Sequence, residues 1–408
     1  MAKPGAQFDK DIADIKATLA KHENRIAALE SNTQVPDPDP VVAVIGGEEN
    51  GEPDVLINAT VSGPSEPPAD PETTRPYGPN APWNVPVSGL THNAIESTEI
   101  SRLVSLDTGF NWNFRQKEYT YPVYHTSDAT VNWTVNALYS ESGLNGSTIP
   151  FNPAWQAGPG TDAQMIILNT ATGEEYNIWK YDSVVSLANS EIVASRINRV
   201  QGDDQGAGTG YDSYFTREVG YKPARGIGIQ YLMGLVRPWE IAQGVIEHAM
   251  SMPVIAPNNE GAFAPATKIE GIQDSGPVRE GLRFSLEVSE AEIDAHLAAM
   301  PGDVSTAMRA SMKVLFTAMR DYGWFITDNS GALGLQLEND QSADWASVDM
   351  VDFTSSGGKT YPRDAMDGLV TQARLRCYVD SKDASYPAFT PSQAASFTDP
   401  DLGTGTTS

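Results

Sequence analysis

The sequence predicts a mainly β head with helical insertions, joined to an N-terminal coiled coil by a proline-rich tether. Three observations support this prediction: a heptad pattern in residues 8–30, dense proline between residues 31 and 87, and short runs of aromatic and β-branched residues further on. We therefore divide the 408-residue chain into a stem (1–30), an acidic tether (31–89), a β-sandwich head (90–380) and an irregular tail (381–408).

Composition excludes several classes of protein. The formal net charge is −26 and the pI is near 4.4, and no cluster of Lys and Arg is present to neutralise phosphates, so nucleic-acid binding is not expected. A single cysteine, Cys377, excludes an intrachain disulfide and a multi-cysteine metal site. It lies in an alternating apolar run, which predicts a buried thiol.

No targeting, membrane or cofactor segment is recognisable. No apolar run approaches the length of a membrane span, and the N-terminus lacks the apolar core of a signal peptide, so we expect synthesis in the cytoplasm and no membrane insertion. The glycine-rich run 202–210 lacks the lysine of a phosphate-binding loop, and no cofactor is expected. Acidic residues are so common that chance pairs do not identify a metal site.

The stem shows a strict 4-3 spacing of apolar residues, which is typical of a coiled-coil seam rather than of a helix packed on a domain. Isoleucine at both core positions favours three strands. The end of the stem, residues 25–30, resembles a short trimerisation motif in which an arginine pairs with a glutamate of the neighbouring helix. The residues assigned to trimerisation are Ile12, Ile15, Leu19, His22, Arg25, Ile26, Leu29 and Glu30.

Two alternatives remain open for the stem. The segment can instead be a helix docked on the head. Within a trimer, three copies of His22 can hold an anion or a water on the axis, or His22 can be a tolerated polar residue that fixes the register.

The tether contains prolines at a density that disfavours helix and sheet and favours an extended spacer. The apolar stretch 41–45 within it either adds a strand to a neighbouring protein or is simply part of the linker. A short N-terminal bundle followed by such a tether resembles the attachment regions of phage tail fibres, minor tail proteins and head fibres. The resemblance implies that the N-terminal region contacts other virion tail proteins.

The head contains several predicted strands and three predicted helices. Residues 118–125, 131–135 and 369–379 are predicted to be strands, and two hairpins are predicted, one of residues 165–169 with 174–181 and one of residues 324–327 with 332–337. Helices are expected from Pro238 to about Met250, from Ser289 onward with a capping box, and from about Val304 to Tyr322. Leu315 and three methionines lie on one face of the last helix.

The order of motifs from Leu144 to about Glu338 resembles an uncharacterised family that is widespread in actinobacteria and their phages. The matching pieces include 161–168, 175–179, 228–236, 244–250, 264–267 with 270–271, 280–284 and 312–331. The resemblance implies a concanavalin-type jelly roll, the fold of lectins, glucanases and alginate lyases. Family members often have His where this chain has Gln164 and Asp where it has Glu270, which weakens a catalytic role for these positions.

A ligand site is predicted around the hairpin strand. Side chains alternate along a strand, so we expect Asn177, Trp179 and Tyr181 to share one face, and a tryptophan flanked by an amide and a phenol suits a sugar ring. Family order implies that Asp162, Gln164 and His248 lie nearby, and Asp162 and His248 are the candidates for catalysis. The alternatives are that Trp179 belongs to the core, that Tyr181 lies at its rim and that His248 is structural.

Together these features lead to the hypothesis of a homotrimeric virion protein of a phage tail, a minor tail protein or fibre that attaches to host cell-surface polysaccharide. A non-catalytic role is preferred. One alternative is a depolymerase, either a glycoside hydrolase or a polysaccharide lyase, and another is a head fibre or capsid decoration protein.

Overall fold

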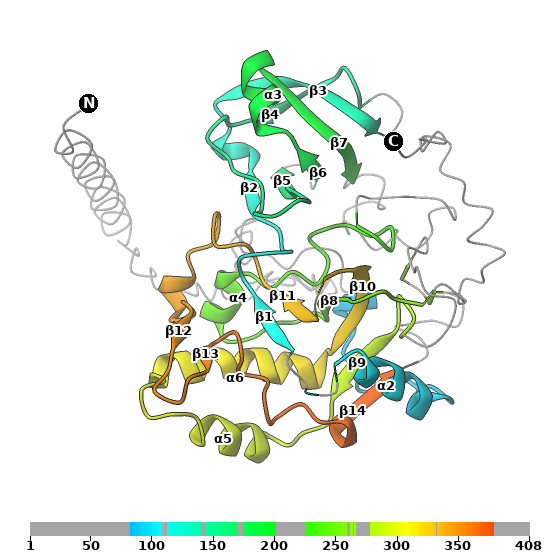
Figure 1. The fold of residues 1–408 in the computed structure, drawn as a ribbon, viewed down its shortest axis with the longest axis vertical. Coiled ribbons are helices and arrows are strands. Elements are labelled where there is room, and N and C mark those ends of the chain that lie inside the picture. Colours follow the sequence, from blue (N-terminus) through cyan, green and yellow to red (C-terminus); the bar gives the residue numbers. More distant parts are fainter. Residues whose placement is uncertain are drawn as a thin grey trace, which may run out of the picture. The chain divides into compact units, whose positions relative to one another are not determined.

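The computed structural model describes most of the head (Figure 1). The stem with its trimerisation residues, the tether up to residue 81, the 202–210 loop, Glu270 and the tail all lie outside the described residues. The described residues are 82–107, 109, 112–140, 144–169, 174–200, 225–258, 262–263, 265–266, 278–331 and 333–378.

The first sheet has six strands in the order β2-β5-β6-β7-β3-β4. The predicted hairpin is confirmed: β5 and β6 pair antiparallel, with Met165 opposite Ile178. Helix α3 (Ser183–Asn189) joins β6 to β7, so these neighbouring strands also run antiparallel. The strands are β2 (Val123–His125), β3 (Val131–Ser140), β4 (Thr148–Phe151), β5 (Met165–Asn169), β6 (Glu174–Tyr181) and β7 (Glu191–Val200).

The second sheet has four strands in the order β14-β9-β10-β8. Two smaller pairs accompany it: β1 (Asn113–Arg115) with β11 (Gly334–Gln336), and β12 (Phe353–Thr354) with β13 (Thr360–Tyr361). The strands of the second sheet are β8 (Met250–Val254), β9 (Arg283–Leu286), β10 (Trp324–Asn329) and β14 (Leu375–Tyr378).

One predicted strand connection is wrong. Both segments of the predicted second hairpin contain a strand, but β10 pairs with β8 and β9, whereas β11 pairs in parallel with β1. The first four residues of β10 are buried, so strands distant in sequence can cover it on both edges. A turn pattern suggests that two consecutive strands pair, but it carries no information about strands distant in sequence that can pair with them instead.

The helices follow their end signals closely. Helix α5 (Glu290–Ala298) has the predicted capping box at Ser289, and α6 (Thr306–Asp321) begins at the cap Ser305 and stops before Gly323. Helix α4 (Pro238–Gln243) is shorter than predicted because Gly244 takes a left-handed conformation, and Met250 already belongs to β8. Helix α2 (Glu96–Ser105) was not predicted. Short 3₁₀ turns occur at η1 (Pro82–Asn84), η2 (Thr126–Asp128), η5 (Trp345–Val348) and η6 (Gln372–Arg374).

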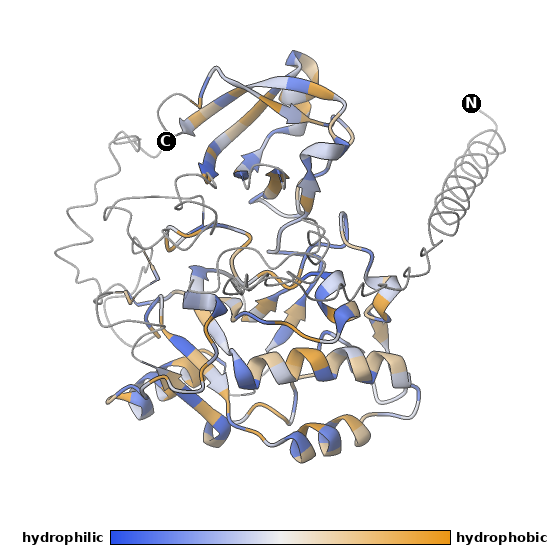
Figure 2. Cartoon of the chain, turned by 180° about the vertical axis from the view of Figure 1, so that it is seen from behind, coloured by the Kyte–Doolittle hydropathy of each residue, from blue (hydrophilic) through white to orange (hydrophobic). Residues whose placement is uncertain are grey.

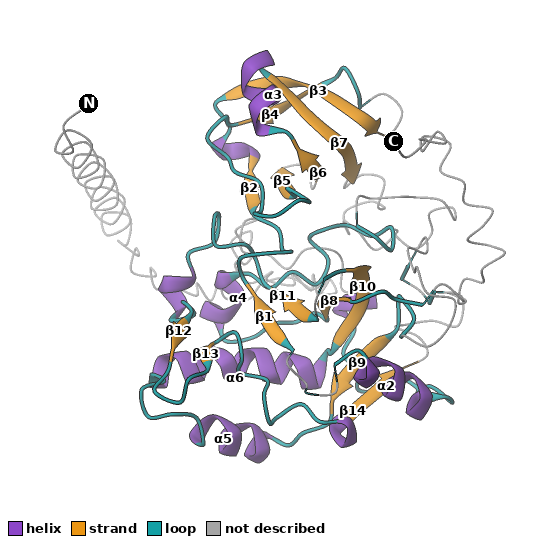
Figure 3. Cartoon of the chain, viewed as in Figure 1, coloured by secondary structure: helices purple, strands orange, loops and turns teal. Residues whose placement is uncertain are grey.

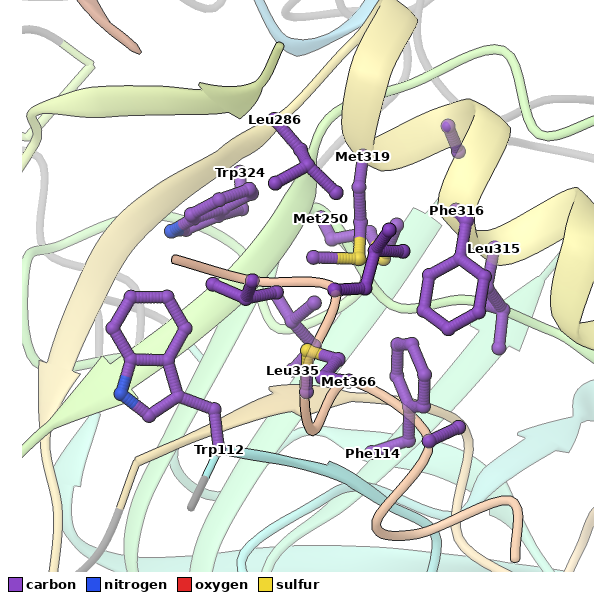
Figure 4. Close-up of a cluster of buried hydrophobic side chains, with 14 of the residues drawn as sticks. Trp112, Phe114, Met250, Leu286, Leu315, Phe316, Met319, Trp324, Leu335 and Met366 are labelled. Carbon is purple, nitrogen blue, oxygen red and sulfur yellow. The ribbon is translucent and has the colours of Figure 1, made fainter. Parts of the chain in front are cut away.

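Helix α6 provides one wall of the largest apolar core. Apolar and polar positions alternate along it with the helical period (Figure 2), and its buried methionines face side chains from the strands. Figure 4 shows this cluster, in which Trp112 lies edge-on to Trp324 and Phe114 packs beside Phe316. Cys377 is fully buried in the same core, as predicted, and burial raises the pKa of its thiol.

The head is thus rich in β-sheet with a few helices, as predicted (Figure 3). The jelly-roll arrangement is not confirmed. A jelly roll pairs its strands antiparallel, whereas β1–β11, β2–β5, β3–β7 and β8–β10 are parallel pairs.

The folded part begins earlier than the predicted boundary at residue 90. Trp83 is buried, and its carbonyl accepts a hydrogen bond from the backbone of Ala249. The buried guanidinium of Arg283 donates to the carbonyls of Pro82 and Val85. Residues 82–87 therefore belong to the head and not to the tether.

Arg225 is the main polar connection in the head. Its guanidinium is fully buried and donates to the carbonyls of Gln230, Tyr231 and Met233, which holds the loop that follows it. Nη1 also donates to Ser251 on β8 and to Gln336 on β11. All five N–H donors of the side chain are thus satisfied, and every acceptor is a neutral group.

Among the residues that the structure describes, no helix is both long enough and apolar enough to cross a membrane.

We expect Arg225→Lys to lower the free energy of unfolding by about 3 kcal/mol, because an ammonium has only three donors and leaves buried acceptors unsatisfied. Urea unfolding followed by fluorescence measures the change. The matched control is Arg363→Lys, since half of the Arg363 side chain is exposed and it pairs with Asp364; its effect should be below about 0.5 kcal/mol. Equal effects of the two substitutions would contradict a stabilising role for Arg225.

Candidate functional site

The structure brings four of the six predicted site residues together at the β5–β6 hairpin. Gln164 and Asn177 both contact Tyr231: Gln164 Nε2 lies 3.4 Å from the phenol oxygen, and Asn177 Oδ1 accepts from the Tyr231 backbone at 2.9 Å. The indole Nε1 of Trp179 donates to Asp162 Oδ1 at 3.2 Å. We call these five residues and Glu175 the polar cluster.

The inner end of the polar cluster is a buried clamp. Asn177 Nδ2 donates to Glu175 Oε1 at 2.6 Å, and the same oxygen accepts from the backbone of Leu232 at 3.0 Å. Both side chains are fully buried. Tyr231 stacks on Tyr121 with ring centroids 4.2 Å apart, and burial raises the pKa of the Tyr231 phenol well above its usual value. The clamp fixes the 231–232 segment against β6.

The outer end of the polar cluster reaches the surface. Trp179 is half-buried, and the Nζ of exposed Lys180 lies 4.4 Å from the centroid of its ring. The hydrogen bond from the indole to Asp162 fixes the edge of the ring, while the ammonium covers a face. The arrangement orients an aromatic surface next to a cation and a carboxylate.

Tyr181 does not share a face with Asn177 and Trp179, so this part of the prediction is wrong. Tyr181 belongs to the apolar cluster of Tyr176 and Ile178, where it packs against Phe151. Lys180 has a left-handed backbone with φ of 52°, which interrupts the regular alternation of side chains along the strand. Such a local break leaves no clear signal in the sequence.

A hollow of about 480 Å³ opens beside the outer end of the polar cluster. Its volume is within the range of small-molecule sites. Apolar lining comes from Leu138, Val193 and Ala194, and Ala163 and Tyr181 complete it. The polar and charged lining residues are Thr161, Lys180, Asp182, Ser183 and Ser195. The lining combines apolar contact surface with hydroxyl, ammonium and carboxylate groups.

His248 lies elsewhere, in the segment before β8, and not on a helix as predicted. It is only 3% exposed, and its Nε2 lies 2.8 Å from Glu240 Oε1, while Nδ1 lies 3.0 Å from the carbonyl of Ala249. Glu240 also caps α4 by accepting from the backbone of Arg237. The helix ends at Gly244, so the chain can turn back and bring together residues eight positions apart.

The sequence missed Glu175, Tyr231 and Lys180 as parts of the site. Glu175 belongs to one of many acidic pairs in the sequence, and Tyr231 lies in a segment with no regular pattern. The positions of all three depend on long-range packing. No group of three or more His, Cys, Asp or Glu side chains suited to a metal ion occurs among the described residues.

The arrangement can bind a polyhydroxylated ligand by stacking and hydrogen bonding. Comparison with known proteins finds no matching family model, no matching curated protein and no matching solved structure.

We expect Asn177→Asp to destabilise the head by about 3 kcal/mol at pH 7, because it places two carboxylates in buried contact. In the folded variant the pair of buried carboxylates retains a proton that the unfolded chain releases above about pH 4. The loss of unfolding free energy should therefore grow as pH rises from 4.5 to 7. Urea unfolding at the two pH values measures this.

The control for this substitution is Asn136→Asp. Asn136 is exposed and donates to Glu191 at 2.8 Å, so the same two groups meet in solvent, and the effect should stay below about 1 kcal/mol. A pH-independent loss in Asn177→Asp would contradict a buried clamp.

Proposed function

We propose that this chain is a trimeric phage tail protein, a minor tail protein or tail fibre, which binds polysaccharide on the host cell surface through its head. The observation that supports binding is the hollow lined by Lys180, whose ammonium lies over the Trp179 ring. It presents apolar contact surface and polar groups of both hydrogen-bonding types at the surface of the head. Sugars need both, because their rings have apolar faces and hydroxyl edges.

The heptad pattern of residues 8–30 supports trimerisation, and the proline-rich tether supports a spacer between stem and heads. Three heads on one stem would bind a repetitive surface together. A weak single site then gives strong attachment, since the second and third contacts form at a high effective concentration.

The position of His248 does not favour the enzymatic alternative, a depolymerase or lyase. At 3% exposure and held by Glu240, His248 is not placed to reach a polymer in solution. Asp162, the other candidate for catalysis, accepts a hydrogen bond from Trp179 and so helps to orient the ring. The head-fibre alternative shares the stem and tether and differs in the place of attachment.

We expect the full chain to sediment as a trimer and Ile15→Asp to convert it to monomers, because a charge at a core position of a coiled coil is poorly tolerated. Sedimentation equilibrium distinguishes the two states. Ala17→Asp, on the outer face of the same predicted helix, should leave the trimer intact. A monomeric wild-type chain would contradict the proposal.

We expect Trp179→Ala to weaken binding of the full chain to its preferred sugar on an array of bacterial envelope glycans by at least about tenfold, since stacking on an aromatic ring provides 1–2 kcal/mol or more. Trp179→Phe keeps a ring but loses the donor to Asp162, and should retain part of the affinity. The control is Val351→Ala, at an exposed apolar residue of a different region. Unchanged binding in Trp179→Ala would show that Trp179 does not take part in sugar binding.

A further inference from the structure

We propose that the ligand of the hollow is a neutral glycan and not an anionic polysaccharide. This inference rests on the proposed glycan binding and specifies the class of sugar. It follows from the charges at the hollow, from the hydrogen-bonding groups that they present, and from the backbone that positions Lys180.

The charge near the hollow is negative. In the lining, the positive charge of Lys180 and the negative charge of Asp182 cancel. Among residues within two positions of the lining residues, Asp162 and Glu191 are negative and Arg196 is positive, which leaves −1. Glu191 lies two residues from the lining residue Val193 on β7, and regular alternation places it on the same side. Charges beyond about 8 Å are largely screened at physiological salt, so this local balance decides. It disfavours a carboxylate or phosphate on the ligand.

The polar groups of the hollow match hydroxyls. Lys180 forms no ion pair among the described residues, and its ammonium can donate to the ring and hydroxyl oxygens of a sugar. Asp182 Oδ1 accepts from the backbone of Val185, so this carboxylate is held in place and can still accept from a ligand hydroxyl. Thr161, Ser183 and Ser195 can donate or accept. An anionic sugar would have Lys180 as the one cation of the lining and would also face Asp182.

The backbone at this place is strained in a way that fixes Lys180. Lys180 and Ala163 both have left-handed conformations, with φ of 52° and 38°, although neither is glycine. Two hydrogen bonds join the two segments: Lys180 N–H donates to the Asp162 carbonyl at 2.7 Å, and Tyr181 N–H donates to the Ala163 carbonyl at 3.1 Å. Strain of about 1–3 kcal/mol per residue typically persists where a site requires it. Here the two hydrogen bonds hold the backbone of Lys180, whose Nζ lies over the Trp179 ring.

The test presents the full chain with matched pairs of oligosaccharides that differ only in the oxidation of C6: glucan and glucuronan, galactan and galacturonan, mannan and mannuronan. We expect binding to at least one neutral member, at least about tenfold weaker binding to its uronate, and less than twofold change between 50 and 500 mM NaCl. Tighter binding of a uronate that weakens with salt would overturn the inference and leave glycan binding intact. Absence of binding to every member and to the envelope glycan array would overturn the proposed function itself.

A charge variant at the site makes the test independent of which sugar is bound. Asp162→Asn keeps an acceptor for the Trp179 indole and removes one negative charge, so the affinity for a uronate relative to its neutral partner should rise about fivefold. Asp303→Asn is the control, since Asp303 accepts from the Ser356 backbone near α5 and α6, away from the hollow. An unchanged ratio in Asp162→Asn would contradict the role assigned to the local charge.

Discussion

The buried guanidinium of Arg225 is the interaction on which much of the head depends. A buried cation is costly unless its hydrogen bonds are satisfied, and here neutral carbonyls, an amide and a hydroxyl satisfy all of them. Because these acceptors come from the loop after residue 225, from β8 and from β11, their relative positions are fixed together. The guanidinium also lies 5.0 Å from the centroid of the Tyr121 ring. The same side chain thus supports the aromatic stack below the polar cluster.

The hydrogen bonds of Arg225 also hold the polar cluster in place. Tyr231 connects the two systems, since its carbonyl accepts from Arg225 and its backbone N–H donates to Asn177. Asn177 is two residues from Trp179 on β6, so an ordered inner end fixes the strand that presents the outer end. Orientation that is set by buried groups reduces the entropy lost when a ligand binds. The side chains that could contact a ligand are therefore at the surface, whereas the buried groups of the polar cluster fix their positions.

Local signals in the sequence predicted the features that depend on interactions within a few residues, namely turns and helix ends. The hairpin of β5 and β6, the capping box at Ser289 and the end of α6 before Gly323 agree with the structure because turn and cap preferences act over a few residues. Strand partners were not predictable in this way. The parallel pairing of β11 with β1, for example, joins segments more than two hundred residues apart.

The candidate site shows the same division. Asp162, Gln164, Asn177 and Trp179 lie at one hairpin, whereas Tyr181 lies on another face, where it lines the hollow, and His248 lies elsewhere. One left-handed residue, Lys180, turned Tyr181 into the core, and an early helix end at Gly244 gave His248 a buried carboxylate partner. Gly244 is a sequence signal for a helix end, whereas the left-handed conformation of Lys180 has no such signal.

The burial of Cys377 has a practical consequence. Because it is the only cysteine of the chain and its thiol is enclosed and reluctant to ionise, it should react slowly with maleimides while the protein is folded. A second cysteine introduced at an exposed position would then accept a dye or spin label selectively. Labelling at the new position would not require removal of the native residue.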